Sequence, residues 1–288
     1  MRLFALTATI LFAIAVAGCS QSGSASSEVV ATTAILTEIT ERVAGPDTEV
    51  TQLLPDGASP HDFQLSARDR ATVNEARLLI TNGGGLETGL ALDSSSATRY
   101  ELIDHVGPLI RSEPDGAPDP HVWMDPDRVA SALPSIARAL SKLNPEQASA
   151  YRSRAASYAR ELSALGRRMS RSLEEVPPAH RYLITSHDSL AYFAQRFGFE
   201  LAASLFPTSG PEAEASAASV EAVERAIERT GVPAIFPEAD SNPAALRQIA
   251  SRTGVRIVRG LRVEAPGRGG YATMLLDDAR LVSRGLSG

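Results

Sequence analysis

The longest periodic segment of the sequence is NPEQASAYRSRAASYARELSALGRRMSRSLEEV, residues 144–176. Asn144 and Pro145 are typical of a helix start, because Asn caps exposed amides and Pro has no amide hydrogen to leave unpaired. At about 1.5 Å per residue, such a helix is longer than one small lobe needs. We therefore predict a linking helix over residues 144–176 that crosses from one lobe to another.

Short apolar strands alternate with amphipathic helices on both sides of this segment, and such alternation implies parallel α/β sheets. Before it we predict strands at 28–33, 48–55 and 77–85, helices at 34–44, 66–76 and 126–143, and an irregular stretch at 92–120. After it we predict strands at 181–186, 199–206, 232–238 and 255–260 and helices at 187–198, 216–231, 242–254 and 271–286. The predicted fold has an N-terminal α/β lobe over 29–143 and a C-terminal α/β lobe over 177–288. Each lobe is a mostly parallel sheet flanked by helices, and the linking helix joins them.

The N-terminus is typical of an exported lipoprotein. Arg2 is the only charge before an apolar run, residues 3–17, that is too short to span a membrane. The run ends in Val16-Ala17-Gly18-Cys19, which resembles a bacterial lipobox. Cys19 is the only cysteine, so no internal disulfide explains it; the alternative is an ordinary signal with a chance cysteine. We predict a signal peptide over 1–18 and a lipidated, flexible tether over 19–28. The tether would anchor the protein to the cell membrane on the extracellular or periplasmic side.

The charge balance argues against one class of partner. The sequence holds 28 Lys and Arg against 34 Asp and Glu, for a formal net charge of −6. An acidic chain does not attract nucleic acid. We expect a monomer with no nucleic-acid partner.

Three of the five histidines lie where a predicted strand has just ended or on a stiff loop: His61 in SPHDFQLS, His121 in DPHVWMDP and His187 in ITSHDSLAYF. The carboxyl ends of strands form the ligand crevice of open α/β sheets, so imidazoles from both lobes would meet there. Neutral imidazole suits Zn²⁺, Fe, Ni and Cu, whereas Mg²⁺ and Ca²⁺ prefer oxygen. We predict a metal site of three histidines; the alternative is three ordinary surface or core residues. We expect His105 and His180 at the surface.

These three segments, in this order, resemble those of the cluster A-I metal-binding lipoproteins, the solute-binding proteins of bacterial zinc and manganese ABC importers. The segments TNGGGLE (81–87) and AIFPEADSNPAALRQIASRTGV (234–255), the lipobox and the long helix are also similar to that family. The resemblance implies an ion buried between the lobes and delivered to an ABC permease. His61 and His121 would come from the N-terminal lobe and His187 from the C-terminal lobe. Three histidines are typical of zinc-type members, so we expect Zn²⁺, with Mn²⁺ less favoured.

The fourth ligand is where this sequence departs from the family. Members usually supply an Asp in a loop after the last strand, but residues 259–271 contain no Asp, and Glu264 is their only acid. Glu238 and Asp240 follow another predicted strand, and a water would also complete a tetrahedron. We predict Glu238 as the fourth ligand because it directly follows the strand. Its alternative role is to support a ligand rather than to bind the ion.

These features predict a receptor that binds a divalent transition metal, and not an enzyme. A zinc-dependent hydrolase is the first alternative, because three histidines with an open position also describe catalytic zinc, with Asp62 or Asp188 as a base. A surface adhesin with a structural metal is the second. The sequence lacks a G-x-S-x-G motif, and TNGGGLETG (81–89) lacks the spacing of a dinucleotide loop.

Overall fold

The structure is a computed structural model that describes residues 28–92, 95–111, 116–206, 216–238 and 243–287. The predicted signal peptide, Cys19 and the tether up to residue 27 lie outside the described residues. Among the helices of the described part, none is both long enough and apolar enough to cross a membrane.

The N-terminal lobe is built on a four-stranded parallel sheet in the order β2-β1-β3-β4. Its strands are β1 (Val29–Ala31), β2 (Val50–Gln52), β3 (Leu78–Thr81) and β4 (Thr98–Glu101). Its helices are α1 (Ala34–Ala44), α2 (Ala67–Glu75) and α3 (Pro126–Leu143). Alternate residues of a strand face opposite sides of a sheet. Val29 and Ala31 accordingly join the main core with α1 and α3, while Val30 joins a separate cluster with Val73 of α2.

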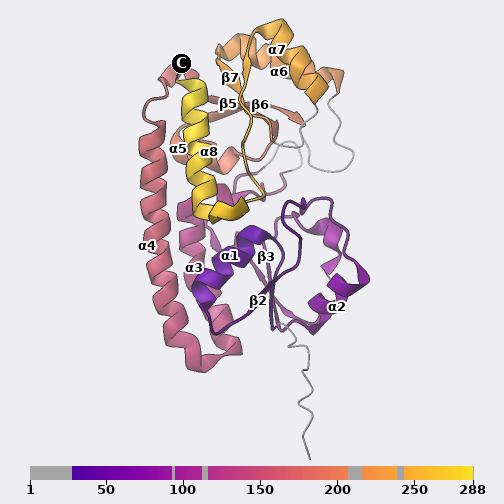
Figure 1. Cartoon of the computed structure of the whole chain (residues 1–288), viewed down its shortest axis with the longest axis vertical. Coiled ribbons are helices and arrows are strands. Elements are labelled where there is room, and N and C mark those ends of the chain that lie inside the picture. Colours follow the sequence, from indigo (N-terminus) through magenta and orange to yellow (C-terminus); the bar gives the residue numbers. More distant parts are fainter. Residues whose placement is uncertain (1–27, 93–94, 112–115, 207–215, 239–242, 288) are drawn as a thin grey trace, which may run out of the picture.

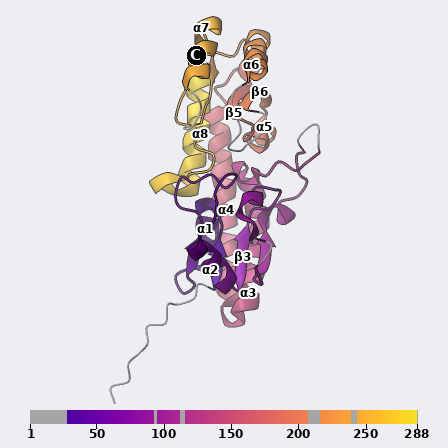
Figure 2. The ribbon, with the colours of Figure 1, turned by 90° about the vertical axis from the view of Figure 1, so that its right-hand side faces the viewer.

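The predicted linking helix is present as α4 (Ala148–Leu173), which is about 39 Å long at 1.5 Å per residue. It packs against α1 and α3 of the N-terminal lobe and against α8 of the C-terminal lobe. Figure 1 shows it running beside both lobes, and Figure 2 shows the same arrangement from the side. The predicted cap at Asn144 is wrong, because its side chain makes no capping hydrogen bond. A 3-10 turn, Pro145–Gln147, comes before the α-helix instead.

The C-terminal lobe contains two parallel strand pairs, joined by a bridge between Thr185 and Phe236. The pairs are β5 (Tyr182–His187) with β6 (Glu200–Phe206) and β7 (Ala234–Ile235) with β8 (Arg256–Ile257). The helices are α5 (Ala191–Phe197), α6 (Ala217–Thr230), α7 (Pro243–Thr253) and α8 (Gly270–Leu286). The predicted architecture of two α/β lobes joined by one long helix is therefore confirmed.

The prediction that residues 92–120 are irregular is wrong at β4. This strand lies at the edge of the sheet, and of its four residues only Tyr100 is buried. The Tyr100 hydroxyl lies 2.7 Å from Ser135 Oγ of α3, which fixes the strand to the helix below it. An edge strand with one buried residue has no apolar run, so periodicity does not reveal it.

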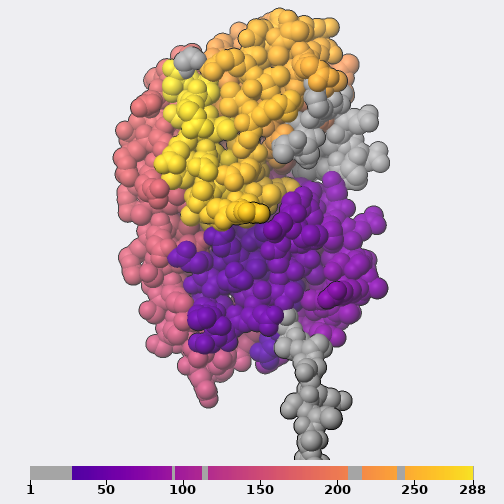
Figure 3. All heavy atoms as spheres, in the orientation of Figure 1, coloured from indigo at the N-terminus to yellow at the C-terminus, as the bar shows by residue number. Residues whose placement is uncertain are grey.

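The two lobes also contact each other directly, between α1 and α8. In Figure 3 the segment at the start of α8, in yellow, lies on the N-terminal lobe, in indigo. The Tyr271 amide donates a hydrogen bond of 2.7 Å to Glu38 Oε2 of α1 across this seam. Further along α8, Asp278 is almost fully buried and its Oδ1 accepts a 3.1 Å hydrogen bond from the Arg262 amide.

Asp278 makes the stability of the protein depend on pH. Burial raises the pKa of its carboxyl from 3.8 to about 8, so the folded state prefers the protonated acid. The stabilisation is complete below the unfolded pKa and is lost as the pH rises through about 8. We expect Asp278→Asn, which keeps the acceptor for Arg262, to remove this loss. Its free energy of unfolding should exceed that of the parent by about 1–3 kcal/mol near pH 9 and by much less near pH 5.

Urea denaturation at a series of pH values measures this difference. The neighbouring Asp277→Asn is the control, because the Asp277 side chain is about half exposed and pairs with Arg262. A difference for Asp278→Asn that does not change with pH would contradict the prediction.

Candidate metal centre

His121 stands on a loop that several hydrogen bonds hold in place. Asn82, just after β3, donates through Nδ2 to the Pro120 carbonyl at 2.8 Å. The buried Glu87 carboxylate in turn accepts from the amides of Asn82 (2.7 Å) and Gly83 (3.0 Å). After His121 comes a 3-10 turn, Val122–Met124, and then α3 begins with Pro126 in its first turn. The segment TNGGGLE therefore supports the loop that carries His121.

A carboxylate behind the ring fixes the orientation of His121. Asp119 Oδ1 lies 2.8 Å from His121 Nδ1 and also accepts a 2.9 Å hydrogen bond from the His121 amide. With Nδ1 bound in this way, Nε2 is left to face the gap between the lobes. The residue is only 2% exposed, so its ring is shielded from water.

His187 is the last residue of β5 and has the same kind of support from Glu238. Glu238 Oε1 lies 2.8 Å from His187 Nδ1 and accepts a 2.9 Å hydrogen bond from Ser189 Oγ. The Glu238 amide donates to Ser186 Oγ at 2.9 Å, which holds the backbone on β5. His187 Nε2 points the other way and lies 3.3 Å from His121 Nε2. The geometry thus places Glu238 behind a histidine, and Asp240 lies outside the described residues.

His61 lies on the turn after β2, close to Gly89. A Cβ at Gly89 would stand 3.1 Å from the His61 carbonyl oxygen, so glycine lets the two loops approach. His61 Nε2 lies 3.2 Å from Glu264 Oε1. Among the described residues this buried nitrogen has no partner with the geometry of a proper hydrogen bond. An electron-pair acceptor such as a metal ion would satisfy it.

Glu264 reaches the site from the loop that follows β8. This loop is held on the C-terminal lobe by a bridge between Leu261 and Glu238 and by the bond from the Arg262 amide to Asp278. Burial alone would raise the pKa of the Glu264 carboxyl. The contact with His61 and positive charge on the three imidazoles outweigh burial, and the pKa lies below its ordinary value of 4.5. Glu264 is therefore an anion at neutral pH.

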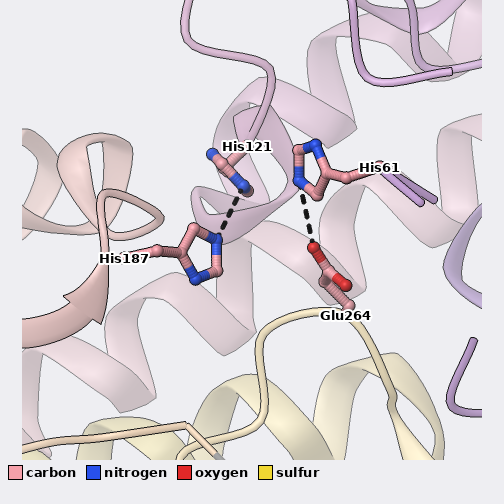
Figure 4. A group of neighbouring side chains, drawn as sticks. All are labelled: His61, His121, His187 and Glu264. Carbon is pink, nitrogen blue, oxygen red and sulfur yellow. Dashed lines mark hydrogen bonds and ion pairs between the residues drawn. The ribbon is translucent and has the colours of Figure 1, made fainter. Parts of the chain in front are cut away.

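Figure 4 shows the four side chains pointing toward one another, two from each lobe. One ligand atom each of His61, His121, His187 and Glu264 lies within 4.8 Å of all the others. The edges of a tetrahedron around Zn²⁺ are about 3.3 Å, given ligand distances of about 2.0–2.2 Å. The two short separations, 3.3 Å for His121–His187 and 3.2 Å for His61–Glu264, match such edges. The group has the donor types and the spacing to hold one transition-metal ion.

The structure also places the residues that the hydrolase alternative would need. Asp62 is exposed, and Asp188 is half-buried beside His187. Burial and the neighbouring Asp119 raise the pKa of the Asp188 carboxyl. Neither belongs to the group of four converging side chains. His105 is exposed, as predicted, while His180 is half-buried and its Nδ1 lies 2.9 Å from the Leu286 carbonyl oxygen.

Sequence reasoning missed two residues of the site. Asp119, two residues before His121, could have been found from the motif Asp-Pro-His, because an acid at that spacing can turn back to its imidazole. Trp123 donates from Nε1 to the Val263 carbonyl at 2.8 Å, across the gap between the lobes. No local pattern indicates a bond between residues that lie so far apart in the sequence.

Known proteins share this architecture along almost the whole chain. The family model described as "Zinc-uptake complex component A periplasmic" matches residues 29–284. The manganese-binding lipoprotein MntA of Halalkalibacterium halodurans is 25% identical over 292 residues, which cover 96% of each chain. The iron-binding protein YfeA of Yersinia pestis is 28% identical over 234 residues, 80% of this chain and 75% of its own.

A solved structure agrees with these matches. The periplasmic zinc-binding protein TroA from Treponema pallidum superposes with a TM-score of 0.82 at 24% identity, covering 90% of this chain and 99% of TroA. The predicted resemblance to the cluster A-I lipoproteins is therefore confirmed, while the relatives are named for three different metals. This chain belongs to the family of the zinc-uptake component A, the metal-binding, substrate-binding proteins of ABC transporters.

Proposed function

We propose that this protein captures Zn²⁺ between its lobes, through His61, His121, His187 and Glu264, and delivers the ion to an ABC permease. The observation that carries the proposal is the convergence of four ligand atoms, two from each lobe, within 4.8 Å. In this proposal the fourth ligand is Glu264, and not Glu238 as predicted from the sequence. Glu238 and Asp119 act behind the histidines, where each fixes which ring nitrogen faces the ion.

Binding, rather than catalysis, fits the surroundings of the site. The four side chains are largely buried. His61 and Glu264, which contact each other, are half-buried. The ligand atoms of all four lie within 4.8 Å of one another, a spacing that suits one bound ion. Transport requires only that the ion enter, be held and be released.

The donor set supports zinc over manganese. Three imidazole nitrogens and one carboxylate oxygen suit Zn²⁺, and at equal availability the Irving–Williams order places Zn²⁺ well above Mn²⁺. Mn²⁺ is the second candidate, because a carboxylate is an oxygen ligand that it accepts. We further propose that residues 1–18 are removed, that a lipid on Cys19 holds the protein at the membrane and that it works there as a monomer. The relatives that are lipoproteins support the anchor.

Replacing any one of the three histidines should weaken zinc binding sharply. Each of His61→Ala, His121→Ala and His187→Ala removes a ligand. Removing a residue that only supports a ligand typically lowers metal affinity by about 10- to 100-fold, and we expect each of these losses of affinity to be at least as large. Competition with a chromophoric zinc chelator measures the dissociation constants. His105→Ala is the matched control, because that ring is exposed and stacks on Tyr100 at 4.7 Å, in the N-terminal lobe. Equal losses in all four variants would refute the assignment.

The two glutamates should differ in what their removal does to the coordination of the ion. Glu264→Gln removes a charged ligand, so we expect X-ray absorption of the zinc-loaded variant to show a changed set of light-atom ligands. Glu238→Gln keeps all four ligands and weakens binding by about 10- to 100-fold through the orientation of His187. If instead Glu238→Gln changed the ligand set and Glu264→Gln did not, Glu238 would be the fourth ligand.

A further inference from the structure

We propose that Trp123 is a positioning residue for the captured ion. Its indole N–H holds the loop that carries Glu264 over the three histidines, and through that carboxylate it helps to set the preference between Zn²⁺ and Mn²⁺. The inference rests on the proposed function, because it requires Glu264 to be a ligand.

Three consecutive residues of the loop have three different anchors. The Arg262 amide donates to Asp278 of the C-terminal lobe at 3.1 Å. The Val263 carbonyl accepts from Trp123 Nε1 of the N-terminal lobe at 2.8 Å. Glu264 then turns its carboxylate to His61 at 3.2 Å. The fourth ligand is thus one residue away from a hydrogen bond that spans the gap between the lobes.

Trp123 is itself held tightly, so its N–H has a fixed direction. It is 4% exposed, and its carbonyl accepts a 2.5 Å hydrogen bond from the hydroxyl of Tyr271, which is fully buried at the start of α8. Its ring stands edge-on to the His121 ring, with 5.2 Å between the centroids. A rigid donor reduces the ordering that Glu264 must undergo when the ion arrives, and such preorganisation is a source of affinity.

With an ion bound, the hydrogen bond from Trp123 to Val263 would complete a closed circuit of contacts through the ion. A bound metal would connect His121 to Glu264, and the backbone from His121 to Trp123 followed by the bond to Val263 connects the same two residues from behind. Without the indole N–H the loop keeps its anchors on the C-terminal lobe, at Leu261 and Arg262. Loss of the donor should therefore loosen Glu264 and leave the fold in place.

The effect should differ between metals. When Glu264 is loose, the remaining donors are three imidazole nitrogens, which favour Zn²⁺, whereas Mn²⁺ depends more on oxygen ligands. Weakening the hold on the only carboxylate among the four ligands should thus cost Mn²⁺ more affinity than Zn²⁺.

The experiment replaces Trp123 in the full chain in two ways. Trp123→Phe removes the donor. Because Trp123 is the only tryptophan, benzothienylalanine, which has sulfur in place of the indole N–H, can be introduced at this one position and keeps the shape of the ring. Titrations with Mn²⁺ and Zn²⁺ should show about fivefold to tenfold weaker Mn²⁺ binding in both variants and a smaller loss for Zn²⁺. In a Glu264→Gln background, neither replacement should change either affinity further.

Tyr100→Phe is the control for a purely structural effect, because it removes another buried hydroxyl contact of the same lobe, that with Ser135. It should lower the melting temperature without changing the ratio of the two affinities. The proposal is overturned if the Trp123 replacements weaken both metals equally, if they change neither, or if their losses add to that of Glu264→Gln. If the histidine variants also bind normally, the proposed function itself fails; if they lose binding while the Trp123 variants do not, only the positioning role fails.

Discussion

Burying polar side chains is costly unless they have partners, and this molecule brings four of them together in the narrow space between its lobes. The arrangement is stable because carboxylates behind two of the histidine rings accept hydrogen bonds from them. Asp119 holds His121, and Glu238 holds His187, so that each ring has one nitrogen satisfied and the other directed at the common centre. Among the described residues, His61 Nε2 is the ring nitrogen left without a well-formed hydrogen bond, and it lies 3.2 Å from Glu264 Oε1. A cation bound at this site would complete the bonding of these side chains.

The scaffold keeps the two halves of the site in register. Neither lobe alone contains all four side chains, so their separation depends on how the lobes pack. Helix α4 contacts helices of both lobes, and the seam between α1 and α8 adds a second connection through Glu38 and Tyr271. Moving one lobe relative to the other has to disturb packed helices, which is a more restricted motion than bending at a loop hinge.

Much of this fold follows from the sequence, but which glutamate lies beside the three histidines does not. The bounds of α1 and α3 match the predictions, because both helices have clear apolar faces and capping residues. Strand β4 is not predicted from the sequence, because a strand with one buried residue has no alternating apolar pattern. The positions of three histidines near strand ends or on a stiff loop were enough to predict that they meet. For the acid, proximity to a strand end favoured Glu238, which lies behind His187 instead. What separates the two glutamates is the path of the loop from Leu261 to Glu264, which depends on contacts with Asp278 and Trp123.

The position of the single tryptophan has a practical consequence. Indole fluorescence responds to nearby charges and to changes in hydrogen bonding, and the Trp123 ring lies beside the His121 ring at the centre of the site. Tryptophan emission from this chain therefore originates wholly at the boundary between the lobes, with no background from other indoles. Binding and release of an ion can be followed in real time by intrinsic tryptophan fluorescence, without attaching a dye.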